Sequence, residues 1–63
     1  MDTNEELRQL MSENNLSQVQ VSEMLEMPLN TLKNYNRTTE PAKVPKVVIV
    51  ALRLSIAARQ REE

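Results

Sequence analysis

The chain has 63 residues and a net charge of −1, and it contains no glycine, cysteine, histidine, tryptophan or phenylalanine. A chain of this length forms one domain, near the size at which a single core is marginal and self-association adds stability. The lack of cysteine and histidine excludes disulfides, thiol chemistry and the usual zinc and haem sites, so we expect no metal and no cofactor. No apolar run approaches the roughly 18 residues of a membrane span, and no signal peptide pattern precedes the domain. We therefore expect a soluble, cytoplasmic protein.

The first helix is predicted to begin near Thr3. Thr3 and Glu6 fit a capping box, in which each side chain accepts a hydrogen bond from the other residue's backbone N–H. The three- and four-residue spacing of one apolar helix face follows at Leu7, Leu10 and Met11. Asn14 and Asn15 should end the helix, because asparagine is the non-glycine residue best suited to left-handed backbone. The outer face is acidic, and we interpret this helix as scaffold.

Residues 16–37 predict two short helices joined by a tight turn. Ser17 and Gln20 form a second capping box at the start of a helix over about residues 18–25. Pro28 suits the first turn of the next helix, about residues 29–36, because a proline there leaves no N–H unpaired. Leu32 and Tyr35 give that helix an apolar stripe, and its other side carries Asn30, Lys33, Asn34 and Arg37. A helix of this kind suits the major groove of DNA.

The two-helix stretch carries a spaced set of residues: Leu16, Ser17, Gln18, Val21, Ser22, Leu25, Met27, Thr31, Leu32 and Tyr35. This set resembles the helix-turn-helix of the lambda-repressor/Cro-like (XRE) family. The stretch departs from the family pattern at Glu26, where a turn glycine is usual, at Pro28, where a capping serine or threonine is usual, and at Asn36 and Thr38. A non-glycine residue at Glu26 can hold positive φ at a cost of about 1 kcal/mol.

The resemblance implies an all-α, lambda-repressor-like domain of four or five helices that spans residues 1–63 and ends in a dimerisation helix. By motif position, the family's base-reading sites correspond to Leu29, Asn30, Lys33 and Asn34. The residues expected to touch phosphate are Gln18, at the start of its helix, Thr31 and Arg37. Asparagine suits adenine edges, lysine suits guanine acceptors and an aliphatic side chain suits a thymine methyl. Cap chemistry is the alternative for the asparagines, chiefly Asn36, and core packing is the expected role of Tyr35.

Residues 38–44 are predicted to form a loop, because no periodic apolar pattern crosses them. Lys43 and Lys46 lie in and just after this loop, where they are placed to contact the DNA backbone. Residues 1–27 carry a net charge of −5 and residues 28–63 a net charge of +4. Attraction to phosphate depends on local potential, so the negative total does not exclude nucleic acid. Ordinary solvated helix faces are the alternative explanation of these charges.

The last element, about residues 45–60, has two interpretations. The β-branched run at residues 47–50 suits a strand, as in the mixed α/β Cro proteins. Pro45 as a helix start, the alanines and a length of about 16 residues favour a helix. As a helix it has two apolar faces. One face holds Val47, Val50, Ala51, Leu54, Ala57 and Ala58, and the other holds Val48, Ile49, Leu52 and Ile56.

A helix with two apolar faces is buried on both. One face should close the core of the first three helices, and the other should pair with a second subunit. The sequence leaves the assignment open, so the candidate dimer contacts are Val48, Ile49, Leu52 and Ile56 of one face and Leu54 of the other. Small phage regulators of this build, including the anti-CRISPR-associated autorepressors, are similar in ending with a proline-led dimerisation helix.

Three classes of function follow from these observations. The first is a dimeric phage or bacterial repressor that binds an inverted repeat in double-stranded DNA and blocks its own or a neighbouring promoter. The second is a protein-interaction module on the same scaffold, such as an antitoxin-like or phage inhibitor protein, which the acidic first helix favours. The third is an enzyme, and we reject it because caps and surface positions account for the carboxylates and hydroxyls. The resemblance places the protein in a bacterial cell or a phage-infected host.

Overall fold

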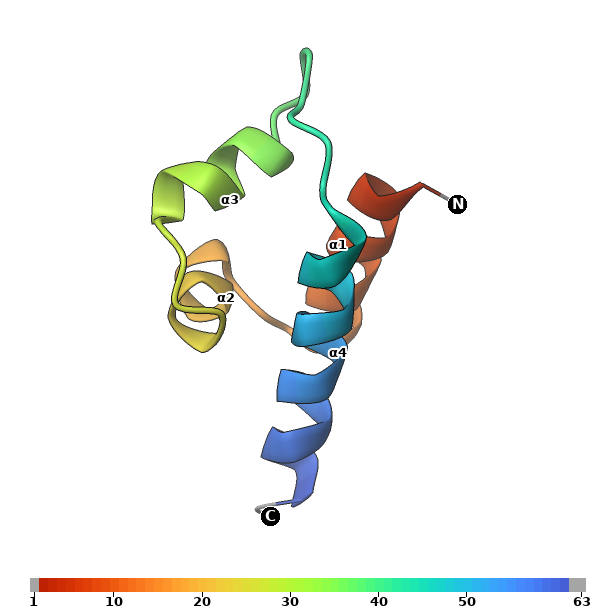
Figure 1. Cartoon of the computed structure of the whole chain (residues 1–63), viewed down its shortest axis with the longest axis vertical. Helices are drawn as coiled ribbons and strands as arrows, with labels where there is room; N and C mark the ends of the chain where they lie inside the picture. Colours follow the sequence, from red (N-terminus) through yellow and green to blue (C-terminus); the bar gives the residue numbers. More distant parts are fainter. Residues whose placement is uncertain (1, 62–63) are drawn as a thin grey trace.

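The computed structural model describes residues 2–61, and in this range the chain is all-helical, with four helices and no strand. The helices are α1 (Thr3–Glu13), α2 (Gln18–Met24), α3 (Leu29–Tyr35) and α4 (Lys46–Arg61). Figure 1 shows α1 and α4 side by side, with α2 and α3 on the opposite side of α4. The predicted all-α class is confirmed, as is the favoured helix over about residues 45–60, and the strand interpretation of residues 47–50 is wrong. None of the described helices is long and apolar enough to cross a membrane.

The start of α1 differs from the prediction in its capping residue. Asp2 is the N-cap, and its Oδ1 accepts a hydrogen bond from the backbone N–H of Glu5 at 2.8 Å. The hydroxyl of Thr3 donates instead to the carbonyl of Val44, 2.6 Å away. The predicted capping box of Thr3 and Glu6 is therefore wrong, although the helix begins at the expected position.

The ends of α1 and α2 share one geometry. Each helix is followed by a residue with left-handed backbone, Asn15 with φ of 54° and Glu26 with φ of 51°. The next residue then donates its N–H back into the helix, Leu16 to Met11 at 2.8 Å and Met27 to Ser22 at 3.0 Å. This is the Schellman pattern, which glycine usually makes possible. The predicted helix end at Asn15 and the positive φ predicted for Glu26 are both confirmed.

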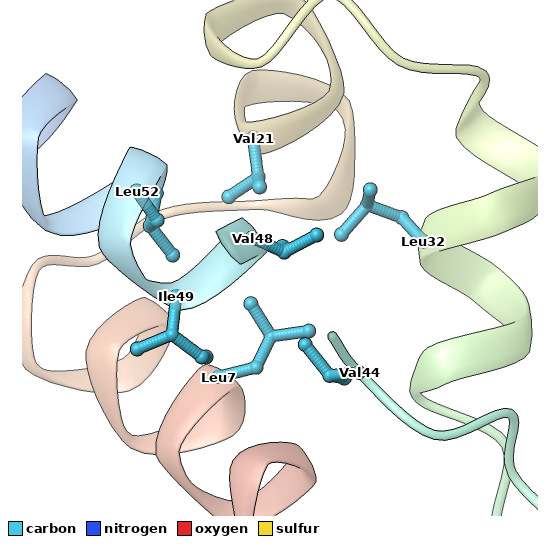
Figure 2. Packing of buried hydrophobic residues seen from close by; sticks show 7 residues of the cluster. All are labelled: Leu7, Val21, Leu32, Val44, Val48, Ile49 and Leu52. Atoms are coloured by element: carbon cyan, nitrogen blue, oxygen red, sulfur yellow. The ribbon is translucent and has the colours of Figure 1, made fainter. Parts of the chain in front are cut away.

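The core is a cluster of seven buried residues that converge from all four helices and from the segment before α4 (Figure 2). They are Leu7, Val21, Leu32, Val44, Val48, Ile49 and Leu52. Val44 belongs to the predicted loop, yet its side chain is only 1% exposed. Tyr35 packs against this cluster as a half-buried residue, which confirms its predicted packing role, and Met11, Met24 and Met27 pack against it as well.

The two apolar faces of α4 have different surroundings. Val48, Ile49 and Leu52 are at most 8% exposed and close the core, and Ile56 packs against them. These residues were candidates for the dimer interface, and the first three are unavailable for it because the monomer core already buries them. On the opposite face Val47, Val50 and Leu54 are 69%, 47% and 67% exposed. The structure thus shows which face of α4 closes the core, and of the predicted dimer contacts Leu54 is the one that is exposed.

Candidate nucleic-acid interface

The outward side of α3 carries polar side chains. Asn30, Lys33 and Asn34 are exposed, with Lys33 and Asn34 three and four residues after Asn30 along the helix, and Arg37 is exposed two residues beyond its end. On the inward side, Leu32 is fully buried. The ion pair seen within residues 2–61 joins Arg53 to Glu6, so Lys33 and Arg37 keep their charges available for a partner.

The remaining predicted contacts of the motif are less accessible. Leu29 and Thr31 are half-buried in the first turn of α3, so each presents only part of its side chain. Gln18 is the first residue of α2 and is also half-buried. Its neighbour Ser17 completes the predicted capping box, accepting from the N–H of Gln20 at 3.1 Å while its own N–H donates to the Gln20 side chain at 2.9 Å. The box fixes the first turn of α2 and thereby the backbone position of Gln18.

The C-terminal end of α3 is capped from within by Asn36. Its backbone N–H donates to the carbonyls of Leu32 and Lys33 at 3.1 and 3.2 Å, and its side-chain Nδ2 donates to Leu32 at 2.9 Å. This is the cap chemistry predicted as the alternative for Asn36, and it is confirmed. The last four carbonyls of a helix have no partner inside the helix, so this cap satisfies two of the four.

Residues far away in sequence satisfy the other two carbonyls. The N–H of Ala42 donates to the carbonyl of Asn34 at 3.0 Å, and Nδ2 of Asn4 donates to the carbonyl of Tyr35 at 3.1 Å. The end of α3 is therefore tied both to the following loop and to α1. Sequence reasoning missed Asn4, because a polar residue in the first turn of a helix gives no sign of a partner 31 residues away.

The two predicted phosphate-binding lysines lie in different surroundings. Lys43 is exposed in the loop segment that Ala42 ties to α3. Lys46 lines a groove between α1 and α4 whose other charged residues are Glu6, Glu13 and Arg53. No residue of α3 lines this groove. Lys43 therefore lies in the loop attached to the end of α3, whereas Lys46 lies beside the acidic residues of α1.

Among residues 28–60, the cations of the second half of the chain do not form one positive face. Lys33, Arg37 and Lys43 belong to α3 and the loop after it, with Glu40 among them. Arg53 pairs with Glu6 at 3.1 Å, and Nη1 of Arg59 lies 3.3 Å from the sulfur of Met24. The net charge of +4 thus overstates the local charge beside α3. The candidate interface is a small patch in which amides and cations contribute together.

Comparison with protein-family models, with curated proteins and with solved structures finds no match to this chain. Within the described range, acidic residues do not gather into a group that could hold a metal ion.

Proposed function

We propose that this protein is a sequence-specific DNA-binding regulator, a dimeric repressor that blocks its own or a neighbouring promoter. One observation carries the proposal. The α3 helix buries Leu32 in the core and presents Asn30, Lys33 and Asn34 to solvent, directly after a capped helix and a tight turn. A short helix held in this way, with amides and a cation outward, has the shape and chemistry for reading base edges in a major groove.

Each exposed group of this interface has a defined partner in DNA. The side-chain amides of Asn30 and Asn34 can bond adenine through two atoms, and Lys33 can donate to guanine acceptors. Arg37 and Lys43 supply charge for phosphates at the end of α3, where the backbone of the loop is fixed. Gln18 and Thr31 contribute from their half-buried positions. Lys46, the other predicted phosphate contact, lines the groove beside α1 and is set apart from these groups.

The exposed face of α4 supports dimerisation. Val47, Val50 and Leu54 form an apolar stripe over more than two turns of a helix whose opposite face is in the core. The groove beside this stripe holds both signs of charge, two acids and two bases. A two-fold axis presents the same patch on both copies, so a second copy can supply apolar surface and opposite charge together. The occupant of this face is therefore a second copy of this chain.

The dimer defines the expected DNA site. One short reading helix makes too few base contacts for useful specificity, and two of them must lie about 34 Å apart to enter successive major grooves. The operator should then be an inverted repeat with half-sites about 10 base pairs apart, or a multiple of that spacing.

Footprinting and fluorescence anisotropy with the DNA that flanks the protein's own gene test this proposal. We expect a protected inverted repeat and an affinity that falls steeply as salt is raised, because the release of counterions from the phosphates, which favours binding, becomes less favourable at higher salt. Equal affinity for this DNA and for a scrambled duplex of the same length at every salt concentration would refute a sequence-specific regulator.

The acidic side of α1 favours a second candidate, a protein-interaction module. Glu5 and Glu13 are exposed, and Glu6 lines the same groove as Glu13. Such a module has no need of phosphate contacts. Its signature would be a weak association with DNA that is insensitive to salt, together with tight binding to a basic protein.

A further inference from the structure

Two polar side chains in the first turn of α1 hold the segment that precedes α4. Nδ2 of Asn4 donates to the carbonyls of Ala42 at 2.8 Å and Tyr35 at 3.1 Å, and Oδ1 of Asn4 accepts from the N–H of Val44 at 3.1 Å. The hydroxyl of Thr3 donates to the carbonyl of Val44 at 2.6 Å. Four hydrogen bonds thus join α1 to residues at least 31 positions away.

The chemistry of this arrangement requires a primary amide at position 4. Two carbonyl oxygens need donors and one N–H needs an acceptor, all from a single short side chain. Aspartate has no donor when ionised, and serine has one donor hydrogen to share between the two carbonyls. The same requirement fixes the orientation of the amide, because a flipped Asn4 would place its oxygen against two other oxygens.

Val44 shows why this attachment holds the loop in place. Its side chain is 1% exposed in the core, and both of its backbone polar groups pair with α1. A buried backbone group without a partner costs about as much as a lost hydrogen bond. The segment at residues 42–44 is therefore attached to the core, to α1 and to the end of α3.

We propose that Asn4 is a positioning residue for DNA binding, which fixes the loop that carries Lys43 against the C-terminal end of α3. This inference rests on the DNA-binding function proposed above. Asn4 itself lies on the scaffold helix and acts through the backbone of Ala42, Tyr35 and Val44. Its removal should displace the phosphate-contacting Lys43 while leaving the exposed face of α3 chemically intact.

Amide hydrogen exchange tests the attachment without DNA. In Asn4→Ala the N–H of Val44 loses its acceptor, and we expect its exchange to accelerate about tenfold more than that of core amides in α4. Thr3→Val removes one donor with little change of shape and should release the same segment more weakly. Gln9→Ala removes an exposed amide from the same helix and should leave Val44 unchanged. An equal acceleration at Val44 and in the core would mean that Asn4 only adds global stability, and would overturn the inference.

A double-mutant cycle with Lys43→Ala tests the role in binding, with the operator duplex as the probe. We expect Asn4→Ala to weaken binding about tenfold in the wild-type background and less than about twofold in the Lys43→Ala background, because two residues that act through one shared backbone shift have non-additive effects. Fully additive effects would overturn a role through Lys43. Failure of the wild-type chain to bind any DNA would instead refute the proposed function and with it the DNA role of Asn4, while the exchange data would still decide whether the attachment exists.

Discussion

The outward sides of α3 and α4 differ sharply, although their inward sides are alike. Inward, α3 buries Leu32 and α4 buries Ile49 and Leu52 in one aliphatic core. Outward, α3 presents amides and cations, whereas α4 presents aliphatic side chains. Core formation requires only the inward sides, so the outward chemistry is free to serve other purposes. Amides and cations suit nucleic acid, and an aliphatic stripe suits another protein surface.

The largest effect should come from placing a charge on the inward side of α4. Leu52→Glu puts a carboxylate into a fully buried site, and we expect a loss of more than about 4 kcal/mol in the free energy of unfolding. A domain of this size has little more than that in total, so the variant should be unfolded at 25 °C. Circular dichroism and urea titration measure this. The matched control Leu54→Glu makes the same change on the exposed side and should stay folded, and an unfolded Leu54→Glu would contradict the assignment of the faces.

Leu54→Glu should also separate the dimer. In the proposed dimer, the two introduced carboxylates would be buried in an apolar contact near the two-fold axis. They would lose their hydration and repel each other there. Sedimentation at micromolar concentration should show a wild-type dimer and a folded Leu54→Glu monomer, with affinity for the full inverted repeat lowered at least tenfold. A wild-type chain that sediments as a monomer, both free and on DNA, would refute the dimer and remove the proposed purpose of the α4 stripe.

The outward side of α3 can be divided into base and phosphate contacts. Asn30→Ala and Asn34→Ala should each cost about 1–3 kcal/mol of binding to the operator and relax the preference for one base pair. Arg37→Ala should weaken binding to all sequences alike and reduce the salt slope by about one. Anisotropy with single-base variants of the operator provides the measurement. If both asparagine variants kept the wild-type discrimination, the polar side of α3 would not be the recognition surface.

The parts of the fold that depend on local chemistry could be predicted from the sequence. The capping box at Ser17 and the helix end at Asn15 each follow from residues within one turn of the feature, whereas the positive φ of Glu26 was expected from the turn glycine of the family pattern that the stretch resembles. The exposed groups of α3 were also predictable, since its polar and apolar residues are clearly segregated.

The parts that the sequence left open, missed or predicted wrongly depend on partners distant in sequence. Both Asp2 and Thr3 can cap a helix. The choice between them depends on Val44, whose carbonyl accepts a hydrogen bond from the hydroxyl of Thr3, and Asp2 is then the cap. Both faces of α4 are apolar, so the sequence does not show which of them lies in the core. That choice, and the position of Lys46, depend on how α4 packs against α1. The attachment by Asn4 spans up to 40 residues. No local pattern predicts such contacts.

The smallest expected effect concerns the turn that aims the outward side of α3. Glu26 and Asn15 occupy equivalent left-handed positions after α2 and α1. Glutamate pays a steric penalty there that glycine avoids and that asparagine largely avoids. We expect Glu26→Gly to raise the free energy of unfolding by about 0.5–1 kcal/mol, part of the gain being lost to the greater freedom of glycine in the unfolded chain. The matched change Asn15→Gly should be close to neutral. Urea titration of both variants compares them directly, and a destabilised Glu26→Gly would mean that the glutamate side chain makes a stabilising interaction that outweighs its backbone strain.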